Sequence, residues 1–191
     1  RLLDARHEVQ AVVPQEQLTE DVPLEDWEPD FDLLTLAEME GDGSWVPSED
    51  FTFAAGIPSM EKEIHYNVVD LHEAPEQPIP IWYTINQDGT GSSGTSSLYI
   101  SYYLARDGEA AQARLERERT SSEYYDYQPI EVPGAEEFWC DSVGLTPEED
   151  VSPAWFVLAR KGDRLLELRY DGTLDLSEWF DEIAAMLTPE G

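Results

Sequence analysis

The C-terminal part of the chain holds the pattern that most limits its fold: two apolar runs, a polar turn and a helix signal. Residues 154–159 are continuously apolar and rich in aromatic and branched side chains, which predicts a strand buried on both faces. Residues 166–170 alternate apolar and charged positions, which predicts a strand with one face in water. Asp175 and Glu178 have capping-box spacing, and residues 176–187 carry apolar side chains at helical spacing. The pattern predicts a β-hairpin covered by an amphipathic helix.

Three segments in the middle of the chain have the composition of strands. Residues 64–71, 79–85 and 98–104 are rich in branched and aromatic side chains. The Gly, Ser and Thr residues of 86–97 predict a flexible hairpin loop. Residues 109–120 have the Ala, Gln, Glu and Arg content of a helix, with a thin apolar side that leaves most of it in water.

Two shorter strands, or a single bent one, are predicted between this helix and the C-terminal hairpin, in residues 124–132 and 137–143, with a break at Pro133 and Gly134. The segments then follow a βββα-βββα order. Runs of adjacent strands favour an antiparallel sheet over a parallel one. The sequence therefore predicts an α+β domain in residues 59–191, with a mostly antiparallel sheet of about five to six strands packed with helices.

Residues 1–58 are predicted to form an acidic, proline-rich N-terminal arm with short helices. Thr35 and Glu38 have capping-box spacing and predict one such helix in residues 36–40. A disordered linker rarely holds many large apolar residues, so we expect the arm to be ordered by lying across the main domain. These anchors are Leu24, Trp27, Phe31, Leu33, Leu34, Trp45, Phe51 and Phe53.

The net charge of -31, from 42 acidic and 11 basic residues, limits the partners. It repels phosphate backbones and anionic lipid, which argues against nucleic-acid binding. A cationic partner, such as a basic protein or a positively charged wall polymer, is compatible with it, although solubility alone also explains the charge. Cys140 is the single cysteine, so no disulfide can form within the chain.

The start of the sequence bears on location. The chain begins at Arg1 rather than methionine and has no run of about 18 apolar residues, so we expect either a removed leader or anchor or a trimmed chain. Residues 1–13 carry one apolar stripe beside Arg1 and Arg6, which fits either the stub of a membrane helix or a short surface helix. We expect an exported bacterial protein, extracellular or at the cell surface, that meets the membrane only through a removed N-terminal anchor.

Three stretches resemble ligand sites but lack a required feature. Residues 89–94 match the dinucleotide fingerprint, but a strand follows them instead of a helix, which argues against a nucleotide. His65 and His72 point to opposite faces of a predicted strand, which argues against zinc. The alternating acids of residues 26–32 lack the glycine and the distal glutamate of a calcium loop, which leaves only weak Ca²⁺ or Mg²⁺ binding open. No cofactor and no metal site is predicted.

No catalytic residue is predicted either. Cys140 precedes Asp141, whose carboxylate disfavours a thiolate, and the chain has no Gly-x-Ser-x-Gly motif. Any two of the 42 acids could meet, so a carboxylate pair cannot be assigned. Aromatic residues of the strand regions form a candidate sugar- or peptide-binding face, with core packing as the alternative. The candidates are Trp82, Tyr99, Tyr103, Tyr125 and Tyr127.

A family resemblance arises from residues 156–168, Phe-Val-Leu-Ala-Arg-Lys-Gly-Asp-Arg-Leu-Leu-Glu-Leu, followed by the helix pattern of residues 176–187. This combination resembles the closing hairpin and helix of Mog1/PsbP-like α/β sandwich domains, which recur in exported bacterial lipoproteins. The resemblance covers residues 154–187 and depends on apolar alternation and a Lys-Gly turn. It implies a fold without an active site of its own, used for binding or docking, and it carries over no functional residue.

The sequence thus favours a non-enzymatic, exported or membrane-anchored bacterial ectodomain that binds a protein or a cell-envelope polymer through a sheet face or its acidic arm. The alternative is a hydrolase of glycans or other cell-envelope material that uses paired carboxylates. Two acids about 5–10 Å apart at the base of an aromatic groove would favour the hydrolase. A calcium-dependent adhesion module is a third hypothesis, which a calcium-dependent shift in melting temperature would support.

Overall fold

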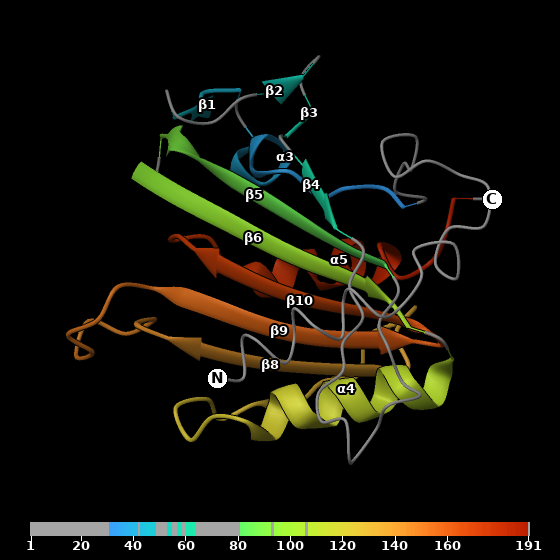
Figure 1. Cartoon of the computed structure of the whole chain (residues 1–191). Coiled ribbons are helices and arrows are strands. Elements are labelled where there is room, and N and C mark those ends of the chain that lie inside the picture. Colours follow the sequence, from blue (N-terminus) through green and yellow to red (C-terminus); the bar gives the residue numbers. More distant parts are fainter. Residues whose placement is uncertain are drawn as a thin grey trace, which may run out of the picture.

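The computed structural model describes residues 31–41, 43–48, 53–54, 57–58, 60–63, 81–92, 94–105 and 107–190. They form an α+β fold in which one antiparallel sheet has helices on both faces (Figure 1), and this confirms the predicted fold class. The central strands, in spatial order, are β5 (Ile81–Gly91), β6 (Gly94–Leu104), β10 (Arg164–Asp171), β9 (Ala154–Lys161) and β8 (Glu137–Val143).

Short strands complete the eight-stranded sheet. β1 (Val46–Pro47) and β4 (Met60–Glu63) pair with β5, and β7 (Gln128–Pro129) pairs with β8. A separate two-stranded ribbon joins β2 (Phe53–Ala54) to β3 (Ile57–Pro58). The predicted βββα-βββα order also needs a strand at residues 64–71, and those residues lie outside the described ranges.

The predicted C-terminal hairpin is present as β9 and β10. Its turn contains Gly162, which has a φ of 58°, a left-handed conformation that glycine adopts without steric cost. Strand β9 is buried on both faces, as predicted. The covering helix begins with a 3₁₀ turn, η2 (Leu176–Trp179), and continues as α5 (Phe180–Ala185). Asp175 caps this turn by accepting a hydrogen bond from the Ser177 amide at 3.0 Å.

The prediction of a flexible loop in residues 86–97 is wrong. These residues extend β5 and β6 to a tight turn after Gly91. Polar residues form strands here because residues of the N-terminal arm cover them. Gln87 and Ser96 are buried, and Ser96 donates a hydrogen bond to Glu40 at 2.7 Å. Gly89 leaves room for the Trp45 ring, since a Cβ at Gly89 would lie 2.5 Å from that ring. Strand glycines often mark such close approaches.

The main core lies between one face of the sheet and a cover made of α5, η2 and residues 31–45. Phe31 stacks on Tyr102 with ring centroids 4.2 Å apart. Helix α3 (Leu36–Glu40) begins with the predicted capping box of Thr35 and Glu38, and this prediction is confirmed. Described residues of the predicted N-terminal arm between Phe31 and Trp45 therefore contribute side chains to the main core, whereas the domain boundary between residues 58 and 59 stays a prediction.

The opposite face of the sheet carries helix α4 (Gly108–Thr120), which begins at the N-cap residue Asp107. Its Leu115 packs with Tyr103, Leu158 and Leu165 in a second core cluster. Figure 1 shows α4 and α5 on opposite sides of the sheet. The apolar side of α4 is thin, as predicted, and cation–π contacts add to it: Arg114 lies 4.8 Å from the Tyr103 ring and Arg119 lies 4.4 Å from the Trp139 ring.

Several predictions fall outside the described residues. They concern the helix of residues 1–13, the acids of residues 26–30 and the His65 and His72 pair. Among the helices that the structure describes, none is both long and apolar enough to cross a membrane.

Candidate functional site

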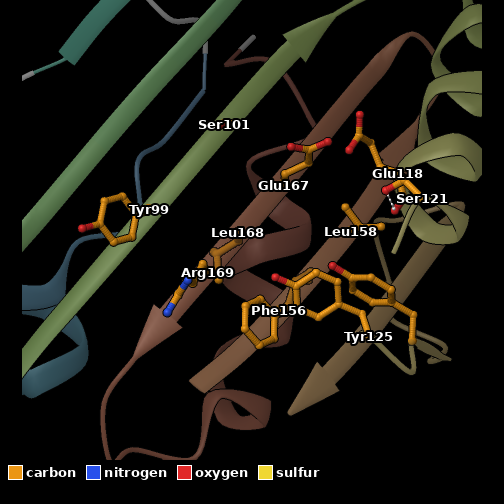
Figure 2. A pocket seen from close by; sticks show the side chains of 12 residues that line it. Tyr99, Ser101, Glu118, Ser121, Tyr125, Phe156, Leu158, Glu167, Leu168 and Arg169 are labelled. Atoms are coloured by element: carbon orange, nitrogen blue, oxygen red, sulfur yellow. Dashed lines mark hydrogen bonds between the residues drawn. The ribbon is translucent and has the colours of Figure 1, made fainter. Parts of the chain in front are cut away.

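The sheet face that carries α4 is covered by that helix only in part, and a pocket lies beyond the helix C-terminus (Figure 2). Strand register builds the pocket floor from two cross-strand rows. One row joins Ser101 of β6, Glu167 of β10 and Leu158 of β9. The next row joins Tyr99, Arg169 and Phe156 on the same strands. Side chains on alternate positions of a strand share a face, so both rows point to the α4 side.

The pocket walls come from the end of α4 and from the segment that follows it. Glu118 and Ser121 form one wall, and Tyr125 and Tyr127 form another. The cavity has a volume of about 270 Å³ and opens to solvent. That volume is near the lower end of the range for small-molecule sites, so the pocket fits one side chain or one small ring system.

Glu167 is the most perturbed acid of this pocket. Its Oε2 accepts a hydrogen bond from the Tyr103 hydroxyl at 3.1 Å, whereas its Oε1 is buried and has no hydrogen-bond partner among the described residues. Burial raises the pKa of Glu167 to about 7, and the nearby Glu118 carboxylate adds to this rise, while Arg114 and the Tyr103 hydrogen bond oppose it. Near neutral pH the Glu167 carboxyl is therefore partly protonated.

Glu118 lies beside Glu167 and has its own cationic partner (Figure 2). Arg114 Nε is 3.1 Å from Glu118 Oε1, the helical ion pair expected from the i, i+4 spacing. Arg114 Nη2 also donates to the Tyr103 hydroxyl at 3.5 Å. Burial, together with Glu167, raises the pKa of Tyr103, so this hydroxyl stays protonated and donates to Glu167.

Arg169 is the basic side chain of the pocket floor, and its charge is already neutralised. Its guanidinium donates to both carboxylate oxygens of Asp171 at 3.0–3.2 Å. It also lies 5.4 Å from the centroid of the Phe156 ring. The ion pair with Asp171 therefore reduces the positive charge that Arg169 adds to the pocket.

Aromatic rings form much of the pocket wall. Tyr125 lies between Tyr127, with centroids 5.7 Å apart, and Phe156, with centroids 4.6 Å apart. Tyr99 and Tyr125 remain 44% and 37% exposed, so a ligand can reach both rings. Exposed aromatic rings on a pocket wall are common at binding sites, because a ligand that covers them removes a large apolar surface from contact with water.

The structure places three of the five candidate face residues, Tyr99, Tyr125 and Tyr127, in this pocket lining. Tyr103 is buried beside the pocket and holds Glu167. Trp82 is the register partner of Tyr103 on β5. The assignment of these five residues to a binding face stays a prediction.

Sequence reasoning missed the two carboxylates. Glu167 was expected to face water, because it alternates with Leu166 and Leu168 in β10. That expectation is wrong, since Glu167 is half-buried and lines the pocket together with Glu118 of α4 and Tyr127. The strand order could have indicated this position. Because β10 lies between β6 and β9 in the centre of the sheet, the face of β10 that carries Glu167 lies on the side of the sheet that α4, the helix after β6, partly covers.

The remaining chemical motifs have structural explanations in the described residues. Burial raises the pKa of the Cys140 thiol to about 12, and the Asp141 carboxylate adds to the rise, so the thiolate is disfavoured. Gly89, Gly91 and Gly94 belong to the β5–β6 hairpin and do not begin a helix. Within the described ranges, no group of three or more His, Cys, Asp or Glu side chains has the spacing of a metal site.

Comparison with known proteins adds no relative. No protein-family model matches the chain, and neither the curated proteins nor the solved structures contain a significant match. The resemblance of residues 154–187 to Mog1/PsbP-like domains therefore stays a prediction.

Proposed function

We propose that the protein is a non-enzymatic binding domain that docks a partner through the pocket of Tyr99, Tyr125 and Tyr127. The carrying observation is that this pocket is open and has exposed aromatic rings. Aromatic anchors that fill or line pockets supply most of the binding energy in many interfaces. The proposed partner is a protein or a cell-envelope polymer.

The proposal also includes an address and a second contact surface. The address is the bacterial cell exterior, with an exported or membrane-anchored chain. The acidic arm of residues 1–58 is the second surface, and in chain order it precedes the domain of residues 59–191, for which we keep the βββα-βββα order. The net charge of -31 supports a basic partner, because opposite potentials speed association.

A pair of tyrosine variants tests this function. A Tyr99→Ala and Tyr125→Ala double variant should lose partner binding by about tenfold or more, since two exposed rings of the pocket are removed. Tyr124→Ala is the matched control, because Tyr124 is 92% exposed and is not among the residues that line the pocket. The three proteins would be used to isolate partners from solubilised cell envelope, and binding would then be measured with the purified partner. Equal binding by the double variant and the wild type would contradict the proposal.

A second function, hydrolysis of a glycan or of other cell-envelope material, is favoured by one observation. Glu118 and Glu167 lie side by side in a tyrosine-lined pocket, and their environments differ: Glu118 has an ion pair with Arg114, while burial raises the pKa of Glu167 to about 7. A raised pKa suits a carboxylic acid that donates a proton to a leaving group.

The hydrolase is tested by reducing-sugar release from a panel of cell-envelope and dietary glycans. If it is correct, Glu118→Gln and Glu167→Gln should each lower the rate by about 10²-fold or more. Glu182→Gln on the opposite face should leave the rate unchanged, because Glu182 is exposed on α5. No release by the wild-type protein across the panel would leave the binding domain as the function to pursue.

A further inference from the structure

We propose that the pocket receives a lysine side chain of a basic partner protein, with the ammonium group at the Glu167 carboxylate and the methylene stem against Tyr125 and Phe156. This inference depends on the proposed binding function and names the chemistry of that site.

The charges around the pocket leave one acid without an opposite charge. Glu118 is paired with Arg114 at 3.1 Å, and Arg169 is paired with Asp171 at 3.0 Å. Glu167 is the lining carboxyl that has no ion pair among the residues the structure describes. A cation that enters the pocket would therefore meet Glu167 as its counter-charge.

The hydrogen bonding of Glu167 narrows the kind of cation. Oε2 already accepts from Tyr103, and Oε1 is the oxygen without a partner. A primary ammonium needs only a single oxygen and can donate to Oε1. A guanidinium binds a carboxylate best through two parallel hydrogen bonds, and a quaternary ammonium has no N–H to donate. The terminal torsion of glutamate is broad, so the carboxylate can turn Oε1 toward the cavity while the Tyr103 hydroxyl rotates to keep its hydrogen bond to Oε2.

The apolar part of the pocket fits the rest of a lysine side chain. Tyr125, Phe156 and Leu158 present carbon surface next to the carboxylate end of the pocket (Figure 2). Lysine combines a methylene stem that packs on such surface with a charged end.

The whole molecule favours a basic protein as the source of the lysine. A net charge of -31 concentrates cationic partners around the chain and repels anionic ones. The partner lysine would also contribute a positive charge where Glu118 and Glu167 lie together, which relieves the repulsion between the two carboxyls.

Binding should be linked to protons through Glu167. The groups that face this carboxyl are Tyr103 from β6, Glu118 and Arg114 from α4, and Tyr127 from the segment after α4, while Leu158 from β9 is apolar. Its pKa of about 7 in the free protein means that an arriving ammonium displaces a proton below that pH. Affinity should therefore rise about tenfold between pH 6 and pH 8 and then level off.

The test uses the peptide acetyl-Gly-Gly-Lys-Gly-Gly-amide and the same peptide with an Nε-acetylated lysine, followed by NMR titration of the protein. The wild type should bind the lysine peptide saturably, with shifts at Tyr125 and Tyr127, and should not bind the acetylated peptide. Glu167→Gln should weaken binding at pH 8 by about tenfold or more and remove the pH dependence. Glu182→Gln makes the same change in net charge on the far face and should bind as the wild type does.

The inference is overturned if the acetylated peptide binds equally well, if Glu167→Gln binds as the wild type does, or if no peptide binds. A neutral chito-oligosaccharide completes the titrations. If it binds the pocket while the lysine peptide does not, the lysine inference fails and the proposed binding function stands. The binding function itself fails only if the Tyr99→Ala and Tyr125→Ala double variant binds the partner as well as the wild type does.

Discussion

Replacing Gln87 by alanine is expected to lower the free energy of unfolding by about 2–4 kcal/mol, a large effect for one polar residue. Gln87 is fully buried in β5 and joins the N-terminal arm to the sheet. Its Oε1 accepts a hydrogen bond from the Leu36 amide at 2.8 Å, and its Nε2 donates to the Leu34 carbonyl at 2.9 Å. Alanine would leave both backbone groups buried without these partners, and each such loss costs about 1–3 kcal/mol.

Urea denaturation of Gln87→Ala and the wild type measures this effect. Gln112→Ala is the matched control, since Gln112 is exposed on α4 and its replacement should change stability by less than about 0.5 kcal/mol. Hydrogen exchange of the Leu36 amide gives a local readout, because that amide should exchange faster once its acceptor is gone. A Gln87→Ala protein with wild-type stability and wild-type exchange at Leu36 would show that the arm does not depend on this residue.

The sequence predicted correctly those helices and strands that are determined by side chains a few positions apart in the chain. The run of residues 154–159, the alternation of residues 166–170 and the cap at Thr35 each follow from side chains a few positions apart. The structure has a strand or a helix in each of these places.

The β5–β6 extension could not be predicted in this way. Residues 86–97 have the composition of a loop, and they form strands because Gln87, Gly89 and Ser96 meet partners from residues 34–45. Such contacts span some 50 positions of sequence. Tertiary context overrides composition when a distant segment satisfies the polar groups.

Three aromatic residues that line the pocket could be named as candidates from the sequence, whereas its two carboxylates could not. The chain has only nine tyrosines, and tyrosine is common on binding faces, so candidate tyrosines could be named from the sequence alone. Glu167 is one of 42 acids, and only the register that sets it between Ser101 and Leu158 under α4 distinguishes it. Strand register and helix placement are set by the whole sheet, and a pattern within one strand does not contain them.

Glu167→Gln is expected to stabilise the protein at pH 8 by about 3 kcal/mol and to leave its stability at pH 4.5 nearly unchanged. The pKa of Glu167 rises from an ordinary value of 4.5 to about 7 on folding, chiefly because of burial. Between these two pH values the folded protein holds a proton that the unfolded chain releases. The contribution of Glu167 to stability is therefore fully present below pH 4.5 and is lost as pH rises through about 7.

The difference in unfolding free energy between Glu167→Gln and the wild type, measured by urea denaturation from pH 4.5 to pH 8, isolates this effect. Acids that do not interact with Glu167 titrate alike in both proteins, so their contributions cancel in the difference, and glutamine keeps an acceptor for the Tyr103 hydroxyl. Glu182→Gln should show a flat difference, because that side chain is exposed on α5. A difference for Glu167→Gln that stays constant across the pH range would mean that the Glu167 carboxyl titrates normally. The proton-linked part of the lysine inference would then fail as well, since both depend on the same buried acid.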